Sequence, residues 1–187
     1  VAEALVAAGH QPVILDLCFS DDPVRDVSSF FREHDVQMAG ISFRNTDDCS
    51  LATRESFIEN ATEVVSAIRA ASNAPVVMGG VGFSVMPVPL MNLLGADLGI
   101  RGDGEFAFVS LARAIEKGES YYELPGLVWK SPGGWVINAP APGELDALPR
   151  MNRNMFDNPR YFAEGGQIGF ETKRGCPMAC SYCADPL

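Results

Sequence analysis

The sequence predicts an α/β protein in which a Rossmann-like parallel sheet is flanked by helices. Short apolar runs typical of buried strands alternate along the chain with longer segments whose apolar residues recur at helical spacing. Several of the apolar runs end in glycine-rich turns, as strands that lead into helices often do. Hydrophobic residues make up 47% of the chain and charged residues 20%, so a packed core is expected.

The N-terminal elements follow from local signals. Residues 1–8 are apolar and rich in alanine, which predicts a helix that Gly9 ends. Residues 12–17 form an apolar run and predict a buried strand. Asp22 and Pro23 then predict a helix start, because aspartate caps helix N-termini and proline suits the first helical position. Apolar residues at helical spacing extend this helix to about residue 33.

The same alternation continues through the middle of the chain. It predicts strands at 38–43, 74–78 and 96–101, and helices at 57–68, 88–94 and from 105 to about 117. The chain opens within a helix, so we expect a first strand of the sheet to precede it.

The pattern changes after residue 117. Two strand-like runs at 124–130 and 135–138, separated by a Ser-Pro-Gly-Gly turn, predict a β-hairpin. We therefore expect a first domain over residues 1–140 that ends in the hairpin. Residues 141–167 are expected to be a linker, and residues 168–187 to begin a second domain with a strand at 168–172.

Charge and cysteine usage exclude some classes of partner. The formal net charge is -10, which argues against a nucleic-acid backbone or an anionic membrane surface as partner. No apolar run approaches 18 residues, and no signal peptide is visible. Five cysteines, three of them clustered, fit the reducing cytoplasm better than a disulfide framework.

The clustered cysteines are the strongest chemical signal in the sequence. Cys176, Cys180 and Cys183 have C-x3-C-x2-C spacing, which lets three thiolates converge on one soft metal centre. Iron–sulfur clusters usually take four thiolates, so three local cysteines indicate a cluster with one iron open to a substrate. A zinc site or ordinary core cysteines are the alternatives, although zinc usually takes a fourth Cys or His ligand.

This motif resembles that of the radical S-adenosylmethionine (SAM) enzymes. The resemblance implies a [4Fe-4S] cluster on Cys176, Cys180 and Cys183, with SAM on the open iron and Tyr182 beside its adenine. It also implies that residues 168–187 begin a parallel β/α barrel. Such a barrel needs on the order of 200 residues, so we expect this chain to be a fragment that lacks nearly all of the catalytic domain.

Three segments lie at the ends of predicted strands, and the second and third of them are rich in glycine. They are residues 42–44, 79–82 and 102–104. Ligands of parallel α/β sheets bind beyond the carboxyl ends of the strands, where glycines let a bulky ligand approach the backbone and leave amides free. Each segment alone is more often an ordinary strand-to-helix turn than a ligand site. The Gly80-x-Gly82 pattern is also a broken dinucleotide fingerprint, but it lacks the βαβ context that NAD binding requires.

Together these segments resemble the cobalamin-binding domain of B12-dependent methyltransferases and mutases. Ser42 matches the serine of the family's Ser-x-Leu motif, although arginine replaces its leucine, and Gly79-Gly80 matches its double glycine. Residues 95–105 are similar to the corresponding segment of B12-binding radical SAM proteins. The resemblance implies a cobalamin site formed by Ser42, Arg44, Gly79, Gly80, Gly82, Gly102, Gly104 and Glu105.

The family's cobalt-ligating histidine lies in a motif that would precede this chain. His10 and His34 lie at predicted helix ends, where histidine is more often a cap or a surface group than a ligand. Many B12-binding radical SAM enzymes lack the histidine, so we expect cobalamin without a protein imidazole on cobalt. Arg44 or Asn45 could then approach that face, and the alternative is that both belong to a solvated polar loop.

The two resemblances imply a cobalamin-dependent radical SAM enzyme. The expected activity of the whole protein is methylation of an unreactive carbon in a small-molecule or natural-product substrate, with flavodoxin or ferredoxin as electron donor. The chain itself is expected only to bind cofactors. The alternatives are a B12-domain radical SAM enzyme that catalyses a rearrangement or cyclisation, and a degenerate scaffold that binds no cofactor.

Overall fold

The structure of the chain is a computed structural model. It describes residues 1–141, 143, 145–167, 169, 171, 174, 176, 178, 180 and 181. The chain divides into two compact units, Val1–Pro149 and Arg150–Leu187. No helix of the described residues has the length and apolar character that a membrane span requires.

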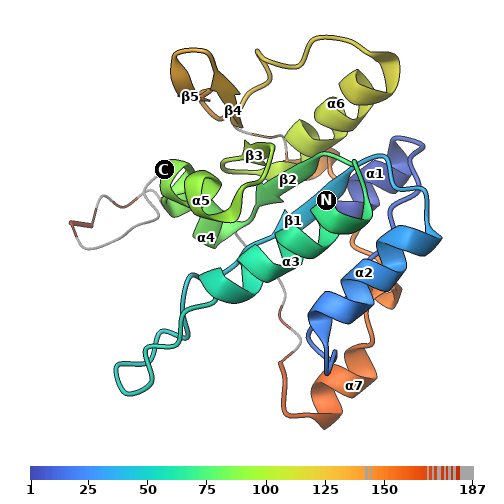
Figure 1. The fold of residues 1–187 in the computed structure, drawn as a ribbon, viewed down its shortest axis with the longest axis vertical. Helices are drawn as coiled ribbons and strands as arrows, with labels where there is room; N and C mark the ends of the chain where they lie inside the picture. Colours follow the sequence, from blue (N-terminus) through green and yellow to red (C-terminus); the bar gives the residue numbers. More distant parts are fainter. Residues whose placement is uncertain are drawn as a thin grey trace. The chain divides into compact units, whose positions relative to one another are not determined.

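The first unit is built on one five-stranded sheet, as the sequence predicts (Figure 1). The strands lie in sequence order and are β1 (Ala39–Ser42), β2 (Val76–Gly79), β3 (Leu98–Ile100), β4 (Leu127–Ser131) and β5 (Gly134–Ile137). The first three are mutually parallel, and the predicted hairpin adds β4 and β5 antiparallel to β3. The predicted α/β class is therefore confirmed, with the hairpin as part of the sheet.

Helices cover both faces of this sheet (Figure 1). α2 (Pro23–Glu33), α3 (Ile58–Ala71), α4 (Val81–Val85) and α5 (Pro87–Leu94) share one apolar core with Val76 and Met78. On the other face, α6 (Gly104–Lys117) buries Leu111 against Val77 and packs beside α1 (Ala2–Ala7). Because β2 is buried on both faces, its sequence is a continuous apolar run, as expected for a central parallel strand.

Strand glycines let aromatic rings pack directly on the sheet. The ring of Phe83 occupies the space that a β-carbon on Gly99 would need. On the opposite face, a β-carbon on Gly40 would lie 2.7 Å from Cζ of Phe108. The absence of a side chain at Gly99 and Gly40 therefore lets α4 and α6 pack closely against the strands.

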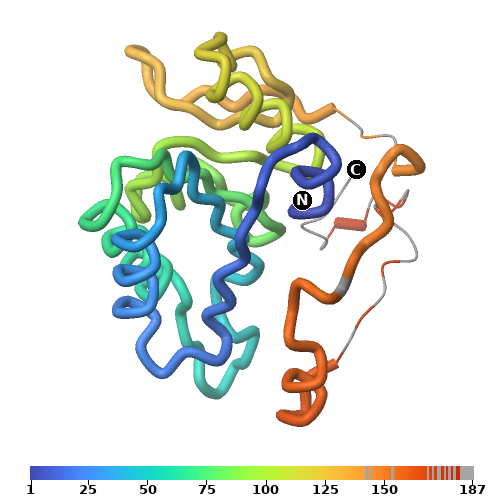
Figure 2. Tube along the Cα trace, turned by 90° about the vertical axis from the view of Figure 1, so that its right-hand side faces the viewer, coloured from blue at the N-terminus to red at the C-terminus, as the bar shows by residue number. Residues whose placement is uncertain are grey.

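The expected strand at residues 12–17 is absent, which corrects the sequence prediction. The structure gives these residues no strand hydrogen bonds, and the side chains of Val13 and Leu15 are 68% and 37% exposed. Figure 2 shows the segment as the blue stretch that connects α1 to α2. β1 is the edge strand and pairs only with β2 among the described residues, and residues 12–17 form no ladder with its free edge.

The second unit contains a short helix that the sequence analysis placed in a linker. α7 (Asn158–Ala163) begins at Asp157, whose side chain accepts a hydrogen bond from the backbone N–H of Arg160 at 3.1 Å. A 3-10 turn at Arg153–Met155 precedes it. The strand expected at residues 168–172 falls largely outside the described residues.

Candidate functional site

The three parallel strands end at one edge of the sheet. Ser42, the last residue of β1, pairs in register with Gly79, the last residue of β2. β3 ends beside them at Ile100, because Gly99 pairs with Met78. We call this the carboxyl edge; it brings together the predicted site segments that follow β1, β2 and β3.

Gly79 leaves open space at this edge. A β-carbon built on it would meet no atom closer than the carbonyl oxygen of Ile100, at 3.9 Å. Ser42 beside it is exposed. A ligand could therefore approach the backbone at the ends of β1 and β2 without displacing protein atoms.

Gly80 and Gly82 pack closely against the backbone that follows β1, and their predicted contact with a corrinoid stays a prediction. Gly80 has a φ of +96°, and a β-carbon on it would lie 2.6 Å from the carbonyl oxygen of Phe43. A β-carbon on Gly82 would lie 2.7 Å from the carbonyl oxygen of Arg44. The space beside these glycines is thus filled by the backbone that follows β1. They permit a close contact within the protein, and only Gly79 leaves its side-chain position open.

Ser84 connects this turn to the end of β3, a role that the sequence analysis missed. Its hydroxyl donates to the carbonyl of Gly80 at 2.9 Å and accepts from the backbone N–H of Gly102 at 3.0 Å. Ser84 follows Gly80 by one helical turn. This spacing is the only feature of the sequence that could have predicted the hydrogen bond between them. The shared hydroxyl fixes the second and third glycine segments relative to each other.

The remaining predicted residues lie where α6 begins. Gly102 has a φ of +88°, and a β-carbon on it would lie 3.2 Å from Cβ of Pro140. Gly104 is the first residue of α6, and Glu105 provides an acidic side chain in its first turn. An acidic group there stabilises the positive end of the helix dipole, so Glu105 has a structural role independent of any ligand.

Two cations flank the glycine segments. Arg44 follows β1 and Arg101 follows β3, and both side chains are exposed. Within the described part of the chain, neither guanidinium forms an ion pair or a side-chain hydrogen bond. The carboxyl edge therefore has two guanidinium groups without an ion-pair partner among the described residues, although the carboxylates of Asp103 and Glu105 lie near the same edge.

The polar loop that follows Arg44, which we call the insertion after β1, is internally ordered. Asp47 pairs with Ser56 in an isolated β-bridge, and Asp48 accepts hydrogen bonds from the Thr53 hydroxyl and the Ser50 backbone N–H. The Thr53 hydrogen bond is the main cause that lowers the pKa of Asp48. Cys49 is exposed, and its hydrogen bond to Asp47 raises the pKa of its thiol, so the thiol stays protonated at neutral pH.

A cavity of about 300 Å³ adjoins the end of β3. Its walls are mostly apolar and come from α6, the turn before β4 and the chain after β5, including Phe106, Ala107, Pro125 and Pro140. Arg101 and Asp103 also line it. The cavity extends the carboxyl edge past β3 toward the hairpin.

The histidines lie at helix ends, as expected. Nδ1 of His34 is 2.9 Å from the carbonyl oxygen of Phe30, and the two rings stack with centroids 4.3 Å apart. Nδ1 of His10 lies 4.0 Å from a carboxylate oxygen of Glu116 on α6. Neither follows a strand at the carboxyl edge, and both therefore stay poor candidates for cobalt ligands.

The cysteine motif is described only in part. Cys176 is an exposed free thiol and Cys180 a partly exposed one, whereas Cys183 and Tyr182 lie outside the described residues. Just before the motif, Arg174 donates hydrogen bonds to Glu171 at 2.8 Å, which lowers the pKa of that carboxyl. Among the residues that the structure describes, no three His, Cys, Asp or Glu side chains gather closely enough to hold a metal ion.

Comparison with known proteins gives the same assignment for the first unit. The family model of the B12 binding domain matches residues 1–112. The tryptophan 2-C-methyltransferase of Streptomyces laurentii is 31% identical over 236 aligned positions, which include 98% of this chain. An uncharacterised methyltransferase of Pyrococcus horikoshii is 27% identical and also aligns with 98% of the chain.

Comparison with solved structures supports the same family. The radical SAM methyltransferase TsrM of Kitasatospora setae, with tryptophan substrate and a SAM analogue bound, superposes with a TM-score of 0.88 and 32% identity over 99% of this chain. A second TsrM structure, with cobalamin and a [4Fe-4S] cluster bound, gives a TM-score of 0.84. OxsB, a cobalamin-dependent radical SAM enzyme, shares the fold with a TM-score of 0.62 at 13% identity.

The chain spans about two-fifths of these methyltransferases: 39% of the two curated relatives and 37% of TsrM. The matched region includes the sheet and its glycine segments. Because the family model matches more than half of the chain and TsrM is similar along nearly all of it, this chain is a member of the B12-binding domain family and is homologous to the radical SAM methyltransferase TsrM.

Proposed function

We propose that this chain is the cobalamin-binding part, with the cluster-binding loop, of a cobalamin-dependent radical SAM methyltransferase. The observation that carries the proposal is the convergence of Ser42, Gly79 and Gly102 at the carboxyl edge of a B12-family sheet. The similarity to TsrM along nearly the whole chain supports the methyltransferase assignment.

The residues at the carboxyl edge fit a corrinoid in different ways. Gly79 gives the ring access to the backbone, and Ser42 offers a hydroxyl to its peripheral amides. Gly80 and Gly82 hold the turn that forms the floor of the site. Gly102, Gly104 and Glu105 would border the ligand at the start of α6.

The exposed cations suit the polar parts of the cofactor. Cobalamin has a phosphodiester in its nucleotide tail, and an uncompensated guanidinium is a favourable partner for phosphate. Arg44 or Asn45 would lie nearest the lower face of cobalt, in place of a histidine.

The cluster would be held by Cys176, Cys180 and Cys183, with Tyr182 beside the adenine of SAM. Cys176 and Cys180 are free thiols that solvent can reach, as cluster assembly requires. When bound, the cluster would supply electrons to SAM, and the corrinoid would carry the methyl group. A cytoplasmic electron donor such as flavodoxin or ferredoxin would complete the system.

The substrate of the whole protein would be a small molecule. TsrM binds tryptophan, which makes tryptophan the first compound to test. A cyclisation is the second candidate, because an anaerobic magnesium-protoporphyrin IX monomethyl ester cyclase of Synechocystis is 29% identical over 91 residues. The mass of the product separates the two, since methylation adds one carbon.

Titration with hydroxocobalamin tests the corrinoid site. We expect the full-length protein to retain cobalamin through gel filtration with a shifted visible spectrum. Gly79→Val should weaken binding by about tenfold or more, because its side chain would enter the open space at the carboxyl edge. Gly133→Val, at an exposed hairpin turn, is the matched control and should bind normally. Equal affinity of the two variants would contradict the site.

Anaerobic reconstitution with iron and sulfide tests the cluster. The protein should gain the visible absorbance and the electron paramagnetic resonance signal of a [4Fe-4S] cluster, and Cys180→Ala should lose both. Cys49→Ala is the control, because this cysteine is also exposed but lies in the insertion after β1. Stoichiometric zinc in the protein as purified, with no cluster after reconstitution, would refute the assignment.

A further inference from the structure

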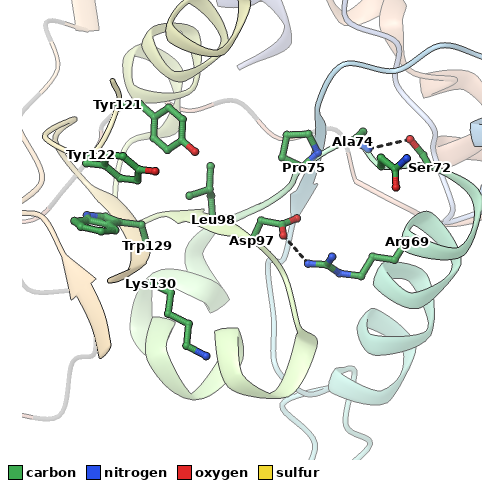
Figure 3. Close-up of a pocket in the computed structure, with 11 residues that line it drawn as sticks. Arg69, Ser72, Ala74, Pro75, Asp97, Leu98, Tyr121, Tyr122, Trp129 and Lys130 are labelled. Carbon is green, nitrogen blue, oxygen red and sulfur yellow. Dashed lines mark hydrogen bonds and ion pairs between the residues drawn. The ribbon is translucent and has the colours of Figure 1, made fainter. Parts of the chain in front are cut away.

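The opposite end of the sheet, where β2 and β3 begin, contains a second cavity. It has a volume of about 420 Å³, within the range of small-molecule sites. Its walls come from the end of α3, the loop before β2, the start of β3, the loop after α6, and β4 (Figure 3). Because β2 separates this cavity from the carboxyl edge, it is not part of the proposed cobalamin site.

One wall of this cavity is formed by the ion pair of Arg69 and Asp97, which hydrogen bonds to the backbone hold in place. Arg69 donates two hydrogen bonds to the carbonyl oxygen of Gly95, at 2.9 and 2.6 Å, and one to Asp97 at 2.8 Å. The second carboxylate oxygen of Asp97 accepts from the backbone N–H of Val76 at 2.8 Å. Both oxygens of Asp97 thus accept a hydrogen bond, whereas Nη1 of Arg69 has no partner among the described residues.

The facing wall is aromatic. The rings of Tyr121 and Tyr122 have centroids 4.8 Å apart, and those of Tyr122 and Trp129 are 4.6 Å apart. Figure 3 shows the two tyrosine hydroxyls directed toward the side of the pocket that Leu98 and Asp97 form. Burial is the main cause that raises the pKa of Tyr121, so its hydroxyl remains a hydrogen-bond donor at neutral pH.

The charges on the two walls do not balance. Asp97 is neutralised by Arg69, but Lys130 also lines the cavity and has no carboxylate partner among the described residues. Its ammonium group lies 5.7 Å from the ring centroid of Trp135, a cation–π contact that leaves its positive charge in place. The cavity therefore has a surplus positive charge and several hydrogen-bond donors in an otherwise acidic chain.

We propose that this cavity binds a planar aromatic carboxylate, with its ring against Tyr122 and its carboxylate between Lys130 and Arg69. Offset or edge contacts between aromatic rings favour a flat ligand on this wall. The surplus positive charge selects an anion over a neutral or cationic ring. The site is independent of the corrinoid, so it stands or falls separately from the proposed function.

Calorimetric titration with three matched probes tests both parts of the ligand. Phenylacetate has a ring and a carboxylate, cyclohexylacetate lacks aromaticity, and phenylacetamide lacks the charge. We expect phenylacetate to bind at least about tenfold more tightly than either analogue. The indole N–H of Trp129 is buried without a partner among the described residues, so its resonance in 15N-tryptophan-labelled protein should shift when the ring binds.

Two variants assign the binding to these residues. Lys130→Gln should weaken phenylacetate binding about tenfold and leave phenylacetamide unchanged, whereas Tyr122→Leu should weaken both aromatic probes. Lys117→Gln, at the end of α6, removes the same charge outside the cavity and should bind like the unmodified protein. The proposal is overturned if phenylacetate does not bind at about 10 mM, if Lys130→Gln and Lys117→Gln bind it equally, or if the Trp129 resonance does not move.

Discussion

The two ends of the same parallel strands are built in contrasting ways. At the carboxyl edge, glycines and one serine hydroxyl bring backbone segments together, and the side chains around Gly79 leave open space. At the amino end, the Arg69–Asp97 pair holds the loops, and aromatic side chains line the cavity. On the two proposals, the first edge would present backbone to a large ligand, whereas the second would present side chains to a small one.

The largest effect should come from a substitution at the carboxyl edge that breaks the backbone contact. Gly80→Ala should lower the free energy of unfolding by about 3 kcal/mol, because the new β-carbon would meet Phe43 and the φ of +96° strains any other residue. Urea unfolding measures the loss. Gly95→Ala is the control, since Gly95 also has a positive φ but a β-carbon there would meet nothing within 4 Å; its cost should be about 1 kcal/mol. Equal losses would show that the close contact contributes nothing.

The corresponding substitution at the amino end is Asp97→Ala. It removes the acceptor of the Val76 backbone N–H and leaves Arg69 without its counter-charge, so the expected loss is about 2 kcal/mol. The ion pair itself is partly exposed and accounts for the smaller share. Asp21→Ala, at an exposed position before α2, should cost little in the same urea assay. A loss above that of Gly80→Ala would reverse the comparison between the two ends.

Ser84→Ala sharpens the comparison within the carboxyl edge. The carbonyl of Gly80 and the N–H of Gly102 would both lose a partner, and the expected loss of stability is about 1 kcal/mol. Corrinoid affinity should fall as well, because the turn and the end of β3 would no longer be held together. Ser66→Ala on the exposed side of α3 is the control. Unchanged stability and affinity would mean that Ser84 does not connect the two segments.

The smallest effect concerns the insertion after β1 and depends on pH. The pKa of Asp48 is lowered from its ordinary value of 3.8, chiefly by the Thr53 hydroxyl. Its contribution to the order of the loop is therefore complete above pH 3.8 and is lost as the pH falls through the lowered pKa. Thr53→Ala should raise the pKa of Asp48 toward 3.8, measured by NMR titration. An identical titration curve for both proteins would contradict this hydrogen bond.

The sequence predicted the carboxyl edge better than the amino end for a physical reason. Strand ends and glycine turns are local signals, and the parallel pairing of β1, β2 and β3 places them together without further information. The cavity at the amino end uses residues from α3, β3, β4 and two loops, which only the folded chain brings together. No local pattern marks such a set.

The incorrect and missing elements have equally specific causes. Residues 12–17 have a strand-like composition, but composition cannot show whether a neighbouring strand is there to pair with. α4 was missed because its segment begins with Gly80-Val-Gly, which reads as a turn, while the packing of Phe83 on Gly99 and the Ser84 hydrogen bonds stabilise the helix. The role of Gly80 was also hidden, since the sequence cannot distinguish a glycine that admits a ligand from one that admits a neighbouring backbone.

The hairpin has a consequence for how the chain leaves the sheet. β5 runs parallel to β3, so it ends at the side where β1 and β2 end, and Pro140 lies against Gly102. The polypeptide that carries the three cysteines is therefore tethered at its starting point beside the glycine segments. The starting point of this polypeptide is thus set by the sheet itself, through the pairing of β5 with β4 and the contact of Pro140 with Gly102.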